Sequence, residues 1–425
     1  SKRLSSEYYK MKILHLSIIV ILSILVFVSA NVAFAQNDTS QLSMGPLPVE
    51  NSGKRFDIKL GFFPGDVLVN PNVNLIYVAD LHGNSISVIS TLTNKTVSTI
   101  TVEQNPDRLA INPSTNIIYS SNINSHSVSV ISGLTNKVVA TIQVGQSPRQ
   151  ILVNPNTNMI YVGNEGSNTV SVISGATNTV VATVKVCNLW GTSFAINEST
   201  NTIYLTCTGP AGAIEVISGS TNDLIDTIPV GRDPTNLVFN PNTNMLYTAN
   251  NGDYTVSVVS GKDNKLVDTI PVGTFPEYIA INPDTNMIYV TSSDNSYYNK
   301  LYVISGATNK VVTTLDVGNG AQNIAIDTSD NLIYVLNYVT NSVSVISGNA
   351  NTVIDTIPVG ANPSFIAINN ITKTVYISNF GSAMISVIPL SNLDLKAAPE
   401  FPFTIPVLLI GITSLIIFYR IKIGK

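Results

Sequence analysis

The chain has 425 residues, only 11% of them charged, and a formal net charge of -4 at pH 7. The two termini are basic and the long central part is acidic, so the sequence lacks the basic stripe that nucleic-acid binding requires, and we expect no nucleic-acid partner. The hydrophobic share of 44% also excludes a disordered chain.

The N-terminal segment has the order of a secretory signal. Lys12 is followed by an apolar run over residues 13–28 and by Ala33-Phe34-Ala35 before Gln36. We therefore predict a signal peptide over residues 1–35, cleaved between Ala35 and Gln36, with residues 1–10 as a possible upstream extension before Met11. A retained transmembrane helix is the alternative, because the apolar run is nearly long enough to span a bilayer. Residues 36–53 form a linker.

The central part of the chain repeats itself at a nearly constant interval. A tyrosine marks each unit, and successive tyrosines are 42 to 45 residues apart, which is the regular spacing of a propeller or a solenoid. The marker tyrosines are Tyr77, Tyr119, Tyr161, Tyr204, Tyr247, Tyr289, Tyr334 and Tyr376.

Each unit contains four short segments rich in Val, Ile, Thr and Tyr, which predict β-strands. Residues 279–281 and 287–290 are examples of the first and second strand, and residues 256–259 and 265–270 of the third and fourth. The turn at residues 282–286 contains a proline flanked by asparagines that tolerate left-handed backbone. Four antiparallel strands per unit predict an all-β propeller blade, and blades must stack around an axis to bury both faces.

The ends of the repeat region predict how the ring closes. The last unit has three strands, ending at residues 385–388, and then runs into Pro389 without a fourth. Residues 56–61 precede the first complete unit and match the pattern of an outer strand, as at residues 140–145. We expect this N-terminal strand to complete the last blade, which gives a propeller of eight blades over residues 54–390. Seven blades is the alternative, with one unit outside the ring.

The repeat unit resembles the YVTN repeat of β-propeller proteins, best known from archaeal surface-layer-type proteins. The motif is degenerate here, as in Tyr161-Val162-Gly163-Asn164 and Tyr289-Val290-Thr291-Ser292. The resemblance implies an exported or surface protein. It implies no reaction, because propellers host both enzymes and passive scaffolds.

The C-terminal segment has the order of a membrane anchor. After a linker over residues 391–400, residues 401–419 are apolar and residues 420–425 are basic, which predicts a transmembrane helix with its basic end inside. Pro399-Glu400-Phe401 before this helix resembles the archaeal PEF-type sorting signal, which a membrane transpeptidase recognises. A cleaved sorting signal and a permanent anchor stay open. Both place the body at the cell surface, with the membrane as a partner through this helix.

Few residues suggest catalysis. Of three histidines, His15 lies in the signal segment, and His82 and His126 lie in loops of adjacent units. With Asp80 they match no standard metal-ligand spacing, so we predict no metal site and no cofactor. Most blades present the same Asn, Ser, Thr and Gly side chains, whereas an active site needs unlike residues at one point. We therefore expect a protein that is not an enzyme.

The departures from the repeat are the candidate binding residues. Arg108, Arg149 and Arg232 follow outer strands, where a propeller gathers side chains at the mouth of its channel, and the sole tryptophan, Trp190, lies in a loop of the same face. An anionic ligand such as a surface glycan or a carboxylate would suit these arginines, although solvated turn residues are the simpler interpretation.

A second group of polar residues ends the second strands of six units and could bind carbohydrate or calcium. The competing interpretation is that each side chain bonds to the backbone of its own turn. The residues are Asp80, Asn122, Asn164, Asn250, Asn337 and Asn379.

Two kinds of covalent modification follow from an exported location. Cys187 ends the outer strand of one blade and Cys207 ends the second strand of the next, so we expect them to form a disulfide; two independent thiols are the alternative. Sequons for N-glycosylation occur at Asn37, Asn94, Asn197 and Asn370.

The sequence favours a non-catalytic surface propeller that contributes to the cell envelope, to adhesion or to ligand binding, with an envelope protein or a glycan as partner. The alternative is an exported propeller enzyme of the lactonase or lyase type, with a site at the channel mouth.

Overall fold

The computed structural model describes residues 55–294 and 297–390. The predicted signal segment with Ala35 and Gln36, the sequon at Asn37, the motif Pro399-Glu400-Phe401 and the apolar segment 401–419 lie outside the described residues. Within the described ranges, no helix has the length and apolar character needed to cross a membrane.

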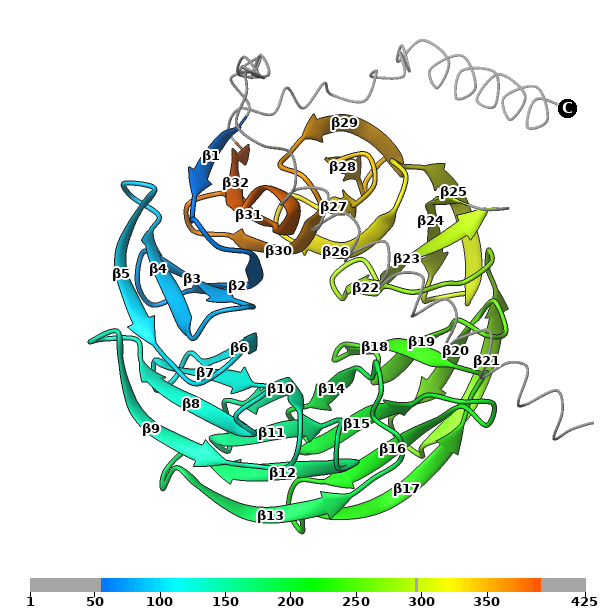
Figure 1. Ribbon diagram of the computed structural model, residues 1–425. Coiled ribbons are helices and arrows are strands. Elements are labelled where there is room, and N and C mark those ends of the chain that lie inside the picture. Colours follow the sequence, from blue (N-terminus) through cyan, green and yellow to red (C-terminus); the bar gives the residue numbers. More distant parts are fainter. Residues whose placement is uncertain (1–54, 295–296, 391–425) are drawn as a thin grey trace, which may run out of the picture. The chain divides into compact units, whose positions relative to one another are not determined.

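The described residues form eight antiparallel sheets of four strands each, arranged as blades around a central channel (Figure 1). The prediction of an eight-bladed all-β propeller is therefore confirmed, and the seven-bladed alternative is wrong. Blades 1 to 7 each consist of four consecutive strands, from β2–β5 to β26–β29, and blade 8 contains β30, β31, β32 and β1.

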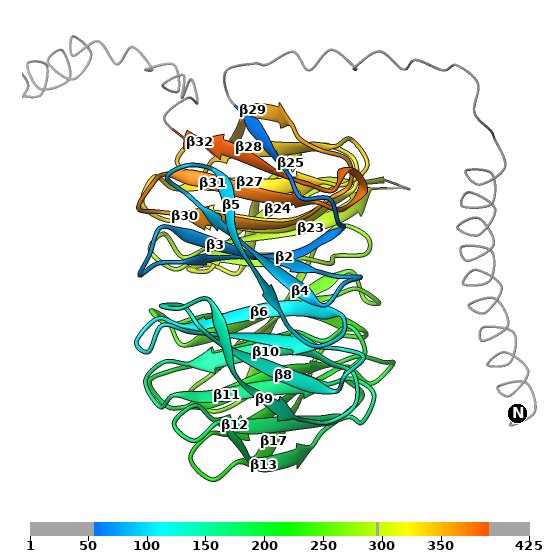
Figure 2. The same cartoon turned by 60° about the vertical axis from the view of Figure 1, so that its left-hand side comes forward.

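The innermost strands line the channel and follow one another around the ring, as β2, β6 and β10 do in Figure 2. They are β2 (Pro64–Asn70), β6 (Pro106–Asn112), β10 (Pro148–Asn154), β14 (Phe194–Asn197), β18 (Pro234–Asn240), β22 (Ile279–Asn282), β26 (Ala321–Asp327) and β30 (Pro363–Asn369). The second strands are β3 (Leu75–Asp80), β7 (Ile117–Asn122), β11 (Met159–Asn164), β15 (Thr202–Cys207), β19 (Met245–Asn250), β23 (Met287–Asp294), β27 (Leu332–Asn337) and β31 (Thr374–Asn379).

The third strands are β4 (Ser85–Ser90), β8 (Ser127–Ser132), β12 (Thr169–Ser174), β16 (Ala213–Ser218), β20 (Thr255–Ser260), β24 (Tyr297–Ser305), β28 (Ser342–Ser347) and β32 (Met384–Pro389). The outer strands are β5 (Lys95–Thr101), β9 (Lys137–Gln143), β13 (Thr179–Lys185), β17 (Asp223–Pro229), β21 (Lys265–Pro271), β25 (Lys310–Asp316), β29 (Thr352–Pro358) and β1 (Phe56–Lys59). One 3-10 turn, η1 (Phe380–Ser382), precedes β32.

The burial of each strand explains its composition. Second and third strands are covered on both faces by neighbouring blades, so they are apolar over most of their length, as in β11 and β12. Outer strands such as β17 face solvent and are mostly exposed. The apolar core is divided into eight clusters, and each cluster joins two adjacent blades. The eight marker tyrosines all lie in these clusters, at most 1% exposed.

Asparagine is abundant because two kinds of turn require it. The turns between first and second strands and between third and fourth strands place Asn at positive φ, as at Asn201 (φ 53°) and Asn136 (φ 53°). Asn tolerates this left-handed conformation better than other residues with a side chain. The expectation from the turn sequence at residues 282–286 is confirmed, since Asn286 has φ 53°.

A second use of asparagine links the blades, and we call it the asparagine belt. The Asn that ends an innermost strand donates from Nδ2 to Oδ1 of the left-handed Asn in the next blade; Asn154 Nδ2 lies 2.7 Å from Asn201 Oδ1. The pairs are Asn70–Asn116, Asn112–Asn158, Asn154–Asn201, Asn197–Asn244, Asn240–Asn286 and Asn282–Asn331, at 2.7 to 3.2 Å. Between blades 7 and 8 the ion pair of Lys373 with Asp327, at 3.2 Å, takes the same place.

The belt uses the amide of one predicted glycosylation site. Asn197 is 4% exposed, its Nδ2 donates to Asn244, and its Oδ1 accepts from the backbone of Ser199 and Thr200. A glycan would need this nitrogen free and at the surface, so the folded protein does not offer Asn197 for modification. Asn370 is exposed and Asn94 is half-buried, and both stay as predicted sequons.

The ring closes as expected. Strand β1 pairs antiparallel with β32, with Phe56 opposite Val387 and Lys59 opposite Met384. Ile58 is 8% exposed and belongs to the cluster that joins blades 8 and 1, together with Val67 and Tyr376. The N-terminal strand thus covers an edge of the sheet and contributes to an interface between blades.

We predict that Ile58→Ala lowers the free energy of unfolding by about 2 kcal/mol or more, because it removes buried methylene groups from this interface. Denaturant unfolding checks this, with Phe56→Ala as control, since Phe56 is 36% exposed on the same strand.

Deletion of residues 54–61 should expose the β32 edge and cause self-association, which light scattering detects. A monomeric deletion variant with unchanged melting would contradict the role of β1 in closure.

Candidate functional site in the central channel

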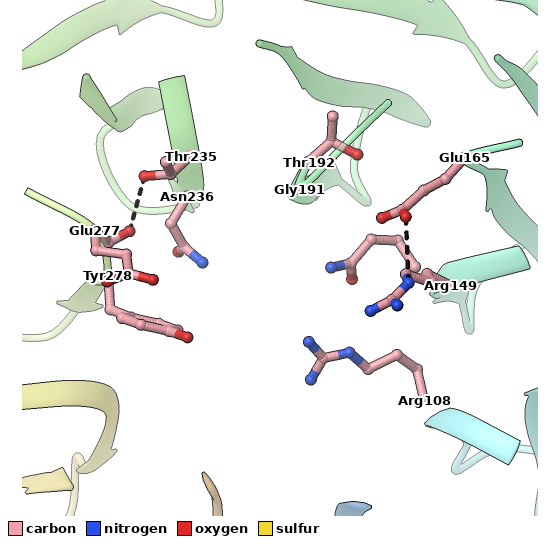
Figure 3. Close-up of a pocket in the computed structure, with 10 residues that line it drawn as sticks. Arg108, Arg149, Glu165, Gly191, Thr192, Thr235, Asn236, Glu277 and Tyr278 are labelled. Carbon is pink, nitrogen blue, oxygen red and sulfur yellow. Dashed lines mark hydrogen bonds and ion pairs between the residues drawn. The ribbon is translucent and has the colours of Figure 1, made fainter. Parts of the chain in front are cut away.

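A polar cavity of about 280 Å³ lies in the channel, between innermost strands from five consecutive blades (Figure 3). It approaches the volumes of small-molecule sites. Its lining residues are Arg108, Arg149, Gln150, Glu165, Gly191, Thr192, Thr235, Asn236, Glu277 and Tyr278.

Repeat register brings these residues to one level of the channel. Seven of them occupy the two positions that follow a proline at or just before the start of an innermost strand. Arg108 follows Pro106 by two, Arg149 follows Pro148, and Glu277 and Tyr278 follow Pro276. Equivalent positions of a closed ring lie at the same height, so unlike residues there face one another across the axis.

Arg108 is the cation with the fewest partners in the cavity. Its guanidinium carbon lies 4.4 Å from the centroid of the Phe365 ring, and its buried Nε has no hydrogen-bond partner in the part of the chain that the structure describes. Over the described ranges it forms no ion pair within 4 Å. Asp66 is near enough that Arg108 counteracts a rise in the pKa of that carboxyl, but burial dominates and raises the pKa of Asp66 to about 6.

Arg149 is held by two carboxylates. Its Nε lies 3.2 Å from Glu165 Oε2, and its NH1 lies 3.8 Å from Oδ2 of the buried Asp107. Burial raises the pKa of Glu165, while Arg149 and a hydrogen bond from the Gly191 backbone lower it. These contacts orient the Arg149 guanidinium toward the cavity, where Figure 3 shows it beside that of Arg108.

The opposite wall carries acidic and phenolic groups. Burial raises the pKa of Glu277, and the Glu277 carboxylate forms no ion pair among the residues that the structure describes. Burial and the Glu277 charge raise the pKa of Tyr278 to about 12, although Arg108 lowers it. Tyr278 is therefore a neutral hydrogen-bond donor at neutral pH. The cavity can bind an anionic group on its arginine side and hydroxyl groups on its Glu277 side.

Two of the four predicted binding residues line this cavity, and two do not. Arg232 precedes its strand-opening Pro234 by two residues, so it lies in the loop before β18, where Nε contacts Asp253 at 2.6 Å. Trp190 is 73% exposed, while its neighbour Leu189 is buried and anchors the loop. Only the next residues, Gly191 and Thr192, reach the cavity.

Asp66, Glu165, Glu277 and Tyr278 are at or beside the cavity and were not predicted from the sequence. An alignment of the repeats on the proline near the start of each innermost strand would have pointed to two of these residues. Asp66 and Tyr278 each follow this proline by two residues, as Arg108 does in blade 2.

The two histidines have other neighbours. His82 packs edge-on against Phe63 and Phe380, with ring centroids 5.8 Å apart in each case. His126 Nδ1 lies 3.0 Å from the Ile123 carbonyl and accepts from the Ser147 backbone at 3.1 Å.

The asparagines that end the second strands donate hydrogen bonds mainly to side chains of the third strand. The interpretation from the sequence was that each would bond to the backbone of its own turn. Asn164 Nδ2 donates to Thr169 and Ser171, and Asn250 Nδ2 donates to Thr255 and Ser257, at 2.9 to 3.1 Å. Antiparallel pairing places two hydroxyl groups opposite each amide, so these residues cross-link strands inside a blade.

The predicted disulfide is present. Cys187 and Cys207 are bonded, with Cα atoms 5.7 Å apart. The bond ties the start of the 187–193 loop to the end of β15, next to the cavity wall formed by Gly191 and Thr192.

A second hollow, of about 640 Å³, lies at the turns between first and second strands of blades 3 to 5. Its lining includes Asn197 and Asn244 of the asparagine belt, whose amides bond to each other. The channel cavity is the better candidate because its charged groups face open space.

Comparison with known proteins supports the fold and no specific activity. The chain is similar to the structure of Kuenenia stuttgartiensis Hydrazine Synthase, with 16% identity and a TM-score of 0.55, covering 78% of this chain and 97% of that one. It is also similar to Dihydro-heme d1 dehydrogenase NirN in complex with DHE, with 14% identity and a TM-score of 0.60, covering 71% of this chain and 67% of that one. No protein-family model and no curated protein matches the sequence.

The raised pKa of Glu277 predicts a pH-dependent effect on stability. Glu277 has a higher pKa in the folded protein than in the unfolded chain. At pH values between these two pKa values the folded state binds more protons than the unfolded state, so Glu277 lowers the free energy of unfolding as the pH rises. Glu277→Gln should raise the melting temperature at pH 7 by a degree or more, and the gain should vanish near pH 4, where both states are protonated. Calorimetry at both pH values checks this, with the exposed Glu103→Gln as control. An equal gain at both values would contradict the assignment.

Proposed function

We propose that this chain is a non-catalytic surface propeller that binds an anionic carbohydrate or a small carboxylate in its central channel. The observation that carries the proposal is the Arg108 guanidinium, which lines a polar cavity and which, among the described residues, has neither an ion pair nor a partner for its buried Nε. A buried donor without a partner is costly, and a ligand carboxylate would accept from it.

The rest of the lining suits a ligand that also carries hydroxyl groups. Gln150 and Asn236 offer amides that both donate and accept, and Glu277 offers an acceptor on the far wall. An acidic sugar combines one carboxylate with several hydroxyl groups, and a channel this polar would exclude an apolar ligand.

A location at the cell surface is part of the proposal. The signal-like N-terminal segment, the apolar C-terminal segment and the likeness to the YVTN repeat all favour export. The Cys187–Cys207 disulfide supports it as well, because disulfides persist in oxidising environments.

A binding experiment with trigalacturonate tests the proposal. Calorimetric titration should show binding to the wild type and weaker binding to neutral trigalactose. Arg108→Ala should lose about 10- to 100-fold in affinity, since a hydrogen bond to a charged group contributes about 1.5–3 kcal/mol. Arg232→Ala is the matched control, because this arginine lies outside the cavity and should leave the affinity unchanged. Equal binding of the neutral trisaccharide, or an unaffected Arg108→Ala variant, would contradict the proposal.

A lyase-type enzyme is the second candidate, favoured by one observation. Glu277, with its raised pKa and no ion pair in the described ranges, lines the same cavity as Tyr278 and Arg108. In β-elimination from a uronate, a base removes the proton next to the carboxylate, the glycosidic oxygen leaves with its electron pair, and an arginine stabilises the charge that develops on the carboxylate.

This second candidate predicts an unsaturated product from trigalacturonate, visible by ultraviolet absorbance and mass spectrometry. Glu277→Gln should then lower the rate at least about 100-fold, as expected for loss of a general base. Tight binding with no product after prolonged incubation would exclude this reaction and leave the binding function.

A further inference from the structure

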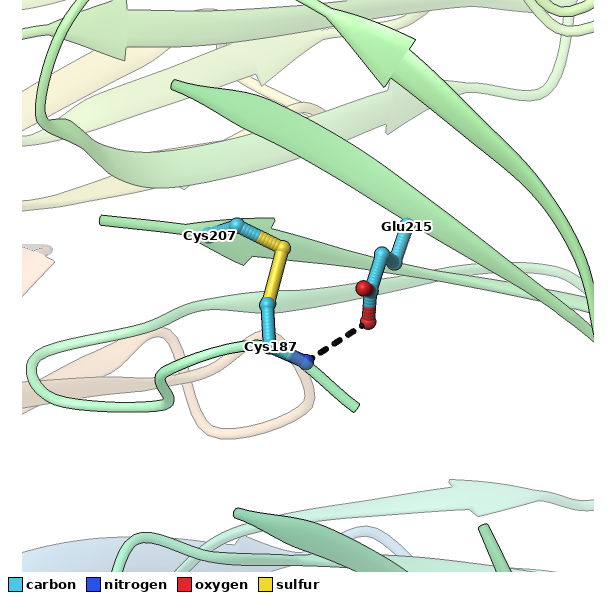
Figure 4. A group of neighbouring side chains, drawn as sticks. All are labelled: Cys187, Cys207 and Glu215. Atoms are coloured by element: carbon cyan, nitrogen blue, oxygen red, sulfur yellow. Dashed lines mark hydrogen bonds between the residues drawn. A yellow bond between two sulfur atoms is a disulfide. The ribbon is translucent and has the colours of Figure 1, made fainter. Parts of the chain in front are cut away.

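One point in the ring departs from the repeat at three neighbouring positions at once. The equivalent point at four other blades holds three residues: a glycine that follows the outer strand of the preceding blade, the Asn that ends the second strand and a serine of the third strand. Examples are Gly231, Asn250 and Ser257 of blade 5. At blade 4 the same places hold Cys187, Cys207 and Glu215 (Figure 4).

Contacts in the other blades explain the usual trio. In blade 5 the serine hydroxyl accepts from the glycine backbone at 3.3 Å and from the Asn amide at 2.9 Å. A Cβ on Gly231 would lie 2.6 Å from the Asn250 amide, so the glycine is required there. The trio is neutral, and its own members provide these contacts.

At blade 4 the two cysteines are bonded, and Glu215 Oε2 accepts from the Cys187 backbone at 3.0 Å. The disulfide accounts for the two cysteines. A serine would accept the backbone N–H, as in blades 5 and 8. Neither the disulfide nor the need for an acceptor of the Cys187 backbone N–H explains why a carboxylate occupies this place.

The charge of Glu215 is unbalanced. The residue is 8% exposed, and it forms no ion pair over residues 55–294 and 297–390. Burial raises the pKa of this carboxyl, and the hydrogen bond from the Cys187 backbone opposes that rise. An uncompensated buried carboxylate is costly, and a cation placed beside it would remove the cost.

The ligand atoms are close enough for one ion. Both sulfur atoms and a carboxylate oxygen of Glu215 lie within 4.8 Å of one another. Thiolates on a tetrahedral zinc ion are about 3.8 Å apart, at zinc–sulfur distances of about 2.3 Å. The Cα separation of 5.7 Å allows this sulfur spacing by side-chain rotation. Cys187 is half-buried, so part of this residue is exposed to solvent.

We propose that the dithiol form of this protein binds a thiophilic divalent cation such as Zn²⁺ through Cys187, Cys207 and Glu215. A dithiol reductant opens the disulfide, giving two thiols and the oxidised cyclic reductant. The incoming ion displaces one proton from each thiol and takes the Glu215 carboxylate as its third ligand, and water fills the fourth position. The oxidised protein lacks thiolates and does not bind the ion at this place.

Cobalt titration of the full chain tests the proposal. The protein is reduced with dithiothreitol, freed of reductant without oxygen and titrated with Co²⁺, whose thiolate complexes absorb in the near ultraviolet. We expect one equivalent to bind with this absorption and to be displaced by Zn²⁺. The unreduced protein should show no such band. Absence of the band after reduction, or its presence without reduction, would overturn the proposal.

Two variants separate the ligands from the fold. Glu215→Ser restores the residue of the other blades and should weaken Co²⁺ binding by the reduced protein about tenfold or more. The triple variant Cys187→Gly, Cys207→Asn and Glu215→Ser restores the whole trio and should bind no Co²⁺. It has no disulfide, so its melting temperature also reports whether the blade folds without the bond. Binding by Glu215→Ser equal to that of the wild type, or by the triple variant, would exclude the assigned site.

Discussion

Burial of each sheet on both faces is the constraint on which the rest of this structure depends. Four strands cannot bury both faces alone, and here every blade completes its core with side chains of its neighbour. The marker tyrosines lie in these shared clusters and are almost completely buried. The chain therefore needs a closed ring, because an open array would leave two apolar faces in water. Pairing of β1 with β32 meets this need with the two ends of the repeat region.

The asparagine belt shows how one residue type can serve six of the eight junctions between blades. A primary amide both donates and accepts, so each inner-strand Asn can close its own turn and still bond to the next blade. Neutral links of this kind repeat around the ring without accumulating charge. Between blades 7 and 8, Asp327 and Lys373 occupy the same place and form an ion pair whose charges balance.

Local patterns were sufficient to predict the strands, the turns, the blade number, the closure and the disulfide. Each depends on repeat spacing or on residues whose positions the repeat fixes. The cavity could not be predicted to the same degree, because it depends on the height of each side chain in the channel. Arg108 and Arg149 follow the strand-opening proline, whereas Arg232 precedes its proline and remains in a loop. The place of Asn197 in the belt could not be predicted for a related reason, since the sequon does not show which contacts its amide makes in the folded chain.

The repeat is also what makes its exceptions informative. The scaffold positions are filled by Asn, Ser, Thr and Gly, and any blade can supply them. Two places hold residues that no scaffold contact requires, the channel cavity and the cluster of Cys187, Cys207 and Glu215. These places share one segment. The 187–193 loop begins at the disulfide and ends at Gly191 and Thr192 in the cavity wall, and Gly191 donates to Glu165, the partner of Arg149. A change at the cysteines therefore has a short covalent path to the arginine side of the cavity, through a loop that Leu189 anchors in the core between blades 3 and 4.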